Sequence, residues 1–270
     1  MKAVRDGRTL ARRDLRGLNL TGLNLRGGHF LECHMQEVDI SGGYLDACLF
    51  KDCGLEGATL REVTFREAFL KGCNLEDADL SDSRFFEASL SQVVMNRTKA
   101  QNTEFRASFL TDVQAWAADL RGVTLERSDL HGSAFISCLM DETRGGFLEA
   151  AQVDFTGSSL TGAVMDRSVL TGCNFTLTRL TNASLRGCSL AQASFLQADL
   201  RGTQFTRSNL EHGNLLRANA EKANLDGANL RGAFLAEGNF TGTSFNGALM
   251  TEVNSEGAEF DGASFEGAQR

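Results

Sequence analysis

The side chains best suited to chemistry in this 270-residue chain are seven cysteines and four histidines. Zinc needs three or four thiolates or imidazoles that converge tetrahedrally, and a disulfide needs two sulfurs in contact. Cys33, Cys53 and Cys73 recur at a constant interval of 20 positions, whereas the histidines are scattered and form no HExxH motif. The sequence also lacks GxSxG, P-loop and strand-linked GxGxxG motifs. We therefore expect no catalytic, cofactor or metal site.

Compartment is indicated by the cysteine count and by the first residues. An odd number of cysteines without paired spacing fits reduced thiols better than a disulfide framework. The opening segment MKAVRDGRTLARRDLRG has no apolar core, and no stretch approaches 18 apolar residues. We expect a bacterial, cytoplasmic protein without a signal peptide or membrane span. Export by a route that needs no N-terminal signal is the alternative.

The elements that must hold these side chains follow a five-residue repeat. Of the 54 positions divisible by five, 46 are Leu, Phe, Met or Ile, and the register is the same from end to end. We call each position divisible by five a centre. The position two before a centre holds a small or β-branched residue, and every cysteine occupies this position. The position two after a centre holds 21 of the 28 glycines. Neither a helix nor a flat strand can turn all these centres to one side. A chain that bends once per repeat, always in the same sense, can do so.

The number of repeats per coil is indicated by the phenylalanines, because stacked coils favour like side chains above one another. Among the 14 Phe centres, eight pairs lie four repeats apart, two pairs lie three repeats apart and one pair lies five repeats apart. Four repeats per coil follow, which predicts an all-β solenoid of about 13 coils over residues 10–270, after an N-terminal segment of residues 1–9. Thiols in such a column lie in a line about 4.8 Å apart, which suits neither zinc nor a disulfide.

The repeat small–Asn/Asp–Leu/Phe–polar–Gly, as in residues 119–122 and 224–227, resembles that of the pentapeptide-repeat family over residues 10–268. The resemblance implies a right-handed quadrilateral parallel β-helix. It also implies a function, because the best-understood members are acidic, rod-shaped dimers. These members mimic B-form DNA, bind DNA gyrase and protect it from quinolones or toxins. Such members often carry projecting loops and a C-terminal helical segment, and this sequence departs from that pattern in its unbroken register.

Charge allows the DNA-mimic hypothesis to be weighed. The net charge is −8, and the excess lies on two faces: the face of Met35 and Leu55 sums to −4 and that of Ile40 and Leu60 to −5. Duplex DNA carries one charge per ~1.7 Å, several times more over a rod of this expected length. We therefore expect a non-enzymatic scaffold or protein-interaction rod that binds an unknown protein and no nucleic acid directly. A DNA mimic that binds gyrase is the alternative.

Three outer features are candidate contact points. Apolar side chains just after the centres of one face predict a partner surface formed by Trp116, Ile136, Leu196 and Leu216. A second run, Leu49, Phe69 and Phe109, occupies positions where Asp or Asn is usual, and it either folds over the corner of the coil or forms a second interface. In segment 143–149 the centre is Gly145, and either Phe147 or Leu148 fills the gap or the segment bulges outward.

The last coil is the fourth candidate. Phe260 and Phe265 are centres with no predicted helix after them to cover them. An open edge above an apolar core favours end-to-end pairing of solenoids. We therefore predict a homodimer through the C-terminal coil.

Overall fold

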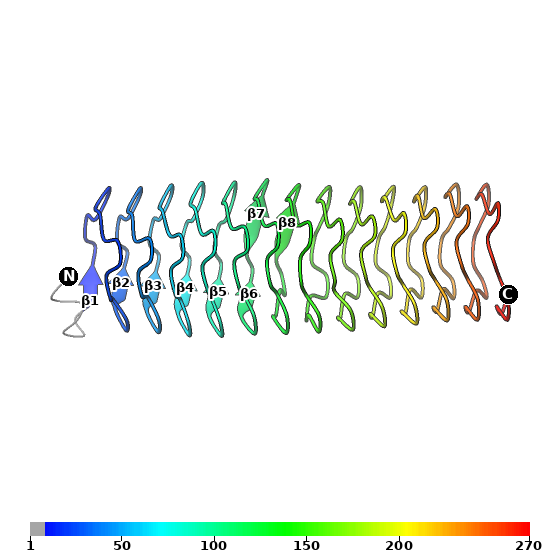
Figure 1. The fold of residues 1–270 in the computed structure, drawn as a ribbon, viewed down its shortest axis with the longest axis horizontal. Coiled ribbons are helices and arrows are strands. Elements are labelled where there is room, and N and C mark those ends of the chain that lie inside the picture. The colour runs from blue at the N-terminus through cyan, green and yellow to red at the C-terminus, as the bar shows by residue number, and fades with distance from the viewer. Residues whose placement is uncertain (1–8) are drawn as a thin grey trace. The chain divides into compact units, whose positions relative to one another are not determined.

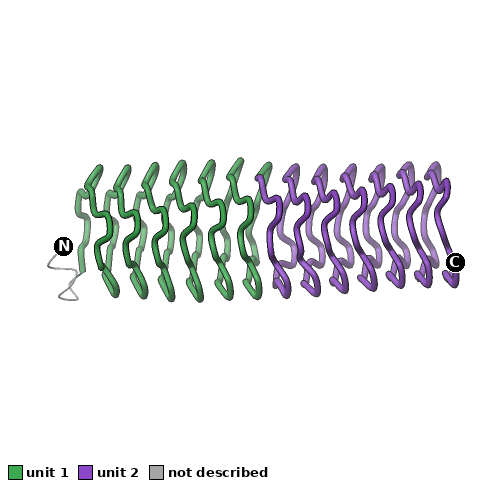
Figure 2. The backbone as a smooth tube through the Cα atoms, in the orientation of Figure 1, with its two compact units in different colours: residues 1–138 green, residues 139–270 purple. Residues whose placement is uncertain are grey.

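A computed structural model describes residues 9–270, and in these residues the repeat forms a parallel β-solenoid with a 20-residue coil (Figure 1). The chain divides into two compact units, unit 1 ending at Cys138 and unit 2 comprising Leu139–Arg270 (Figure 2). The predicted fold class, an all-β parallel solenoid, is confirmed. The predicted N-terminal segment 1–9 lies, apart from Thr9, outside the described residues.

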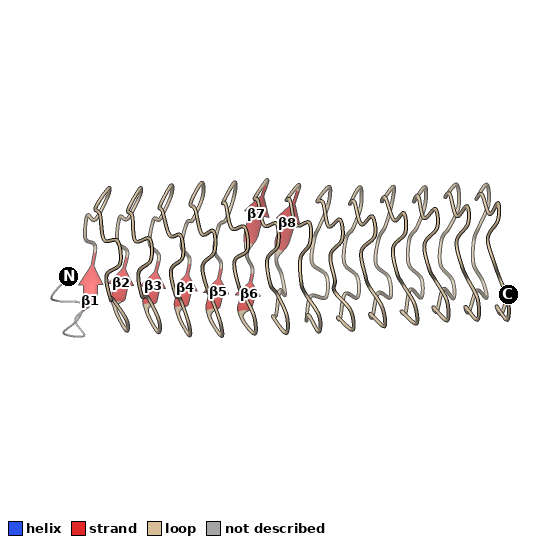
Figure 3. Ribbon diagram, in the orientation of Figure 1, coloured by secondary structure: helices blue, strands red, loops and turns tan. Residues whose placement is uncertain are grey.

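Within residues 9–138, unit 1 contains eight strands of three residues each (Figure 3). Six of them form one parallel sheet in chain order, and the last two form a second parallel sheet. Every pairing joins a residue to the one 20 positions later, as in Phe30 opposite Phe50. The strands are β1 (Thr9–Ala11), β2 (His29–Leu31), β3 (Leu49–Lys51), β4 (Phe69–Lys71), β5 (Ser89–Ser91), β6 (Phe109–Thr111), β7 (Gln114–Trp116) and β8 (Ala134–Ile136).

Unit 2 keeps the same register through isolated parallel bridges, from Leu139 opposite Ser159 to Leu249 opposite Gln269. The prediction of about 13 coils differs from the extent of the regular β-sheet, because strands continue through six successive coils only, from β1 to β6. The reason is local: the chain turns after every fifth residue, so few residues between turns stay extended. In unit 2, successive coils are joined by several isolated bridges each instead of by strands.

Each turn depends on the residue two after a centre, which adopts a left-handed conformation. Glycine suits this position, as at Gly162 with a φ of +67°, and its N–H donates to Thr181 O at 3.0 Å in the next coil. Larger residues also occupy it, including Phe147 and Leu177 at φ of +59° and +58°. The hydrogen bond from one turn to the next therefore holds the conformation even where glycine is absent.

The core consists of the centre side chains, stacked coil upon coil. The rings of Phe30 and Phe50 are parallel with centroids 4.7 Å apart, and those of Phe155 and Phe175 in unit 2 are 5.1 Å apart. Such ladders confirm that four repeats make one coil.

The small residue two before each centre also points inward and is satisfied there. Ser128 Oγ donates to Phe105 O at 2.5 Å, and Cys173 Sγ donates to Ala150 O at 2.8 Å. Hydroxyl and thiol side chains can therefore use the same carbonyl, the one 23 positions earlier, and the slot accepts either. Thr143 differs, because its hydroxyl donates to Met140 O at 2.7 Å.

The irregular segment 143–149 stays in register. Leu148 is buried and takes the space that a side chain at Gly145 would need, because a Cβ on Gly145 would lie 2.7 Å from Leu148 Cδ1. Phe147 lies outside, at the turn. Gly145 still donates its N–H to Val164 O at 2.7 Å, so the segment is a filled defect and not a projecting loop.

Within residues 9–270 there is no helix with the length and apolar character required to cross a membrane.

Candidate interaction surfaces

The thiols and imidazoles form no metal site in the described part of the chain. No three His, Cys, Asp or Glu side chains there are placed to bind one metal ion. All seven cysteines are buried thiols. Burial raises the pKa of Cys48, Cys173 and Cys188 to about 12, and that of Cys138 to about 11. These sulfurs are protonated at neutral pH and are not activated as nucleophiles.

The predicted partner surface begins, in unit 1, with Trp116 and Ile136. They are direct neighbours in the β7–β8 sheet, and Trp116 is fixed further by its backbone N–H, which donates to Asn96 Oδ1 at 3.0 Å. The Trp116 side chain is 52% exposed, whereas Ile136 is half-buried. The structure therefore brings these two predicted residues together, and Trp116 is the one that offers a large exposed ring.

In unit 2 the predicted residues are Leu196 and Leu216, one coil apart and both half-buried. Sequence reasoning missed Phe234, whose side chain is 51% exposed. It lies 18 positions after Leu216, the same offset that brings Asn174 Nδ2 within 2.8 Å of Thr156 Oγ1 on this face. Phe234 therefore lies beside Leu216. The signal for it was a phenylalanine at a position where Asn or Asp is usual.

The second predicted run forms a strip along the β1–β6 sheet, which we call the Phe69 strip: Leu49, Phe69 and Phe109. Phe69 and Phe109 are 56% and 54% exposed, and Leu49 is half-buried. At the other end of the same strands, Lys51 and Lys71 are exposed neighbours in register and have no ion pair in the described residues. The outer face of the sheet thus carries a row of apolar side chains and, parallel to it, a pair of lysines.

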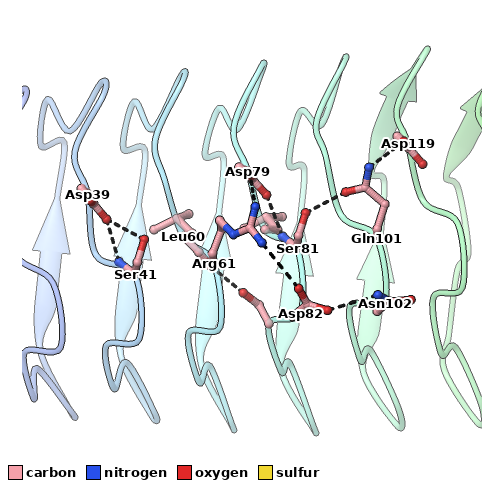
Figure 4. Close-up of polar contacts among 12 residues, drawn as sticks. Asp39, Ser41, Leu60, Arg61, Asp79, Ser81, Asp82, Gln101, Asn102 and Asp119 are labelled. Atoms are coloured by element: carbon pink, nitrogen blue, oxygen red, sulfur yellow. Dashed lines mark hydrogen bonds and ion pairs between the residues drawn. The ribbon is translucent and has the colours of Figure 1, made fainter.

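The most acidic face, that of Ile40 and Leu60, is a network of polar contacts (Figure 4). Arg61 lies 3.6 Å from Asp79 and 3.9 Å from Asp82, measured between nitrogen and oxygen. Gln101 donates to Asp119 Oδ2 at 2.7 Å. The carboxylates on this part of the face are bound to neighbouring side chains and do not form a row of free charges like DNA phosphates.

In the last coil the centres Phe260 and Phe265 are half-buried and pack on the rings one coil earlier. A hollow of about 490 Å³ opens there, lined by Val253, Ser255 and the two Phe rings together with Met250, Glu252 and Arg270. Arg270 lies over the Phe265 ring, with its guanidinium carbon 4.1 Å from the ring centroid. The predicted dimer end is therefore a partly exposed apolar hollow.

Comparison with known proteins gives one family match. A family model described as Pentapeptide repeats matches the chain in eight copies, which together cover more than half of it. The matched residues are 14–52, 53–92, 73–112, 151–187, 178–215, 203–242 and 239–269. No curated protein sequence matches the chain.

Several solved structures are similar to the chain at low identity. HetL, a pentapeptide repeat protein involved in heterocyst differentiation regulation from the cyanobacterium Nostoc sp., is 20% identical with a TM-score of 0.21, covering 96% of this chain and 90% of HetL. Full-length QnrB1, a plasmid-mediated fluoroquinolone resistance protein, is 18% identical with a TM-score of 0.29, covering 83% and 92%. The A-module of the mannuronan C-5 epimerase AlgE4 from Azotobacter vinelandii is 8% identical with a TM-score of 0.36, covering 99% and 90%. Similarity at this level says nothing about function.

Proposed function

The chain belongs to the pentapeptide-repeat family, and from this premise we propose that it is a non-enzymatic scaffold that binds a protein partner through unit 1. The observation that supports the proposal is the exposure of Phe69, Phe109 and Trp116 on regular strands. The centres beside Phe69 and Phe109, Leu70 and Leu110, are each only 1% exposed. The aromatic rings therefore stand on a buried, fixed backbone.

This arrangement suits binding for two physical reasons. Aromatic side chains contribute large apolar area with few rotatable bonds, and they dominate the energetics of many interfaces. Strands held in a ladder need no ordering when a partner binds, so little of the contact energy is lost to conformational entropy.

The partner that fits the Phe69 strip is a protein segment with apolar side chains flanked by carboxylates. The apolar side chains of the partner would cover Phe69 and Phe109. Its carboxylates would pair with Lys51 and Lys71, which lie at the other end of the same strands. Trp116 lies in β7, directly after β6 in the chain, and is a second anchor on the next face.

A capture experiment with immobilised full-length protein tests this proposal. Trp116→Asp reduces retention of the partner by at least about tenfold, because it removes an interface anchor. Tyr44→Asp is the matched control, since Tyr44 is an exposed aromatic residue in unit 1 on a different face. If both variants retain the partner as well as the unchanged protein does, Trp116 is not part of the binding surface.

The alternative function is a DNA mimic that binds gyrase. It is favoured by the acidic excess of −4 and −5 on two faces. It is opposed by ion pairs on those faces, such as Arg97 with Asp77 at 2.7 Å and Arg201 with Asp199 at 2.6 Å. A gyrase supercoiling assay separates the two: we expect no change in supercoiling or quinolone sensitivity, and inhibition or protection would favour the mimic.

We also propose that the hollow in the last coil receives a second copy of this chain. The backbone N–H groups of Phe260 and Phe265 donate to no carbonyl within residues 9–270, so this edge can pair with another edge. Light scattering tests the proposal against the monomer mass of 29.2 kDa. A doubled mass supports the dimer if Phe265→Asp returns it to the monomer mass and Phe234→Asp leaves it doubled. A monomer mass at high protein concentration overturns the proposal.

A further inference from the structure

The Phe69 strip is interrupted by one small residue. In the sheet, Phe69 lies opposite Ser89 and Ser89 lies opposite Phe109, so a single serine separates the two exposed phenylalanines. Ser89 is half-buried on a fixed backbone, because its N–H donates to Ala68 O at 2.8 Å and the next residue, Leu90, is fully buried. The two outer phenylalanines are therefore two coils apart, with only the short serine side chain in the coil between them.

The core of the same three coils shows what fits between two such rings. Phe65, Phe85 and Phe105 form a ladder there, and each outer position follows one of them by four residues. The Phe85 ring stacks with its centroid 4.3 Å from that of Phe65 and 5.0 Å from that of Phe105. Two coils, about 10 Å, thus give one ring the space to contact the rings on both sides. In the outer column the coil spacing is the same and the middle ring is missing.

The outer rings do not close this space themselves. Within residues 9–270 neither Phe69 nor Phe109 stacks on another aromatic ring, and the two side chains are 56% and 54% exposed. We call the space over Ser89, between these two side chains, the Ser89 gap.

The charges beside the Ser89 gap differ between its two sides. Lys51 and Lys71 lie after the strip, at the other end of the strands. Glu67 and Glu87 lie before it, at the turns that precede Phe69 and Ser89, and both are exposed. A segment that brings an apolar side chain into the gap therefore places its carboxylates on the lysine side and not on the glutamate side.

We propose that an aromatic side chain of the partner inserts into the Ser89 gap and completes the outer ladder. This inference rests on the proposed binding by the Phe69 strip and names the side chain that the strip prefers. A ring in contact with two other rings is stabilised beyond its buried area, whereas an aliphatic side chain fills the same space without that gain. The carboxylates that pair with Lys51 and Lys71 set the direction in which the segment crosses the strip.

Fluorescence polarisation with the full-length protein and a labelled peptide tests the proposal. The probe is a short acidic peptide of Asp, Gly and Ser residues that carries a single Trp. We expect saturable binding that weakens about tenfold or more when Leu replaces the Trp, because the two ring contacts are lost. A peptide in which Lys replaces every Asp should not bind, because its charges would face Lys51 and Lys71.

Ser89→Phe distinguishes insertion into the gap from binding to a general apolar patch. The variant adds apolar surface but fills the gap, so it should weaken binding of the Trp peptide about tenfold or more. Phe69 and Phe109 hold the same position in the adjacent coils, so the fold accepts the change, and circular dichroism checks that it does. Ser189→Phe is the matched control, since Ser189 holds this position of the coil in unit 2, and it should leave binding unchanged.

The inference is overturned if the Trp peptide does not bind, or if Ser89→Phe binds it as tightly as the unchanged protein does. It is also overturned if Ser189→Phe weakens binding as much as Ser89→Phe does. Equal binding of the Trp and Leu peptides, lost for both in Phe69→Asp/Phe109→Asp, overturns the inference and leaves the proposed function standing. Equal binding of the Trp peptide by that double variant and the unchanged protein counts against the Phe69 strip itself.

Discussion

At the scale of single residues, the slot two before each centre explains why the cysteines are structural. Cys173 and Ser128 make the same hydrogen bond to a carbonyl 23 positions earlier, so sulfur and oxygen are interchangeable there. The sequence predicted this role, because every cysteine falls in one slot of the repeat.

Alkaline pH tests this interpretation of the cysteines. Burial raises the pKa of Cys173 to about 12, while an unfolded thiol titrates near 8.5. Because the folded pKa is the higher one, the stabilisation is present below about pH 8.5 and is lost as pH rises toward 12. Cys173→Ser keeps the hydrogen bond to Ala150 and removes the titration. Between about pH 8 and about pH 10, the unchanged protein should lose about 2 kcal/mol more unfolding free energy than the variant.

Urea unfolding at the two pH values measures this difference. The other titrating groups are common to both proteins, so they cancel in the comparison. Equal pH dependence in the two proteins would contradict a buried, protonated Cys173.

At the scale of structural elements, Gly145 and Leu148 form one packing unit. Gly145→Leu restores the repeat pattern but drives a side chain into Leu148, and overpacking of this kind costs about 1–3 kcal/mol. Leu148→Ala alone leaves a cavity and costs about 2–5 kcal/mol. The double variant should recover most of both losses, because the new leucine takes the space that the old one leaves.

Unfolding free energies of the two single variants and the double variant measure the coupling. We expect the double variant to be at least about 1 kcal/mol more stable than the sum of the single effects implies. Additive effects would mean that Leu148 does not fill the space beside Gly145.

The element scale also separates what the sequence could predict from what it could not. The coil length followed from the Phe ladder, since Phe30 and Phe50 stack as expected. Whether the segment at Gly145 is filled or bulges outward depends on where Leu148 packs. The five-residue periodicity carries no information about the packing of a single side chain.

At the scale of the whole molecule, the sequence predicts one β-helix over residues 10–270, because the register does not shift at Cys138 and Leu139. In repeat proteins each coil is stabilised by its neighbours, so an unbroken array tends to unfold cooperatively. We predict a single urea transition, with circular dichroism and Trp116 fluorescence changing together. Two separated transitions would show that the chain folds as two domains.

Binding by the Phe69 strip is the central claim, and quantitative capture of the partner by the Phe69→Asp/Phe109→Asp double variant tests it most directly. Both side chains are more than half exposed, so the double variant should keep its fold. We predict that it retains at most about a tenth of the partner bound by the unchanged protein, whereas Tyr44→Asp retains nearly all of it. Equal retention by the unchanged protein and the double variant, with both folded, would contradict the account.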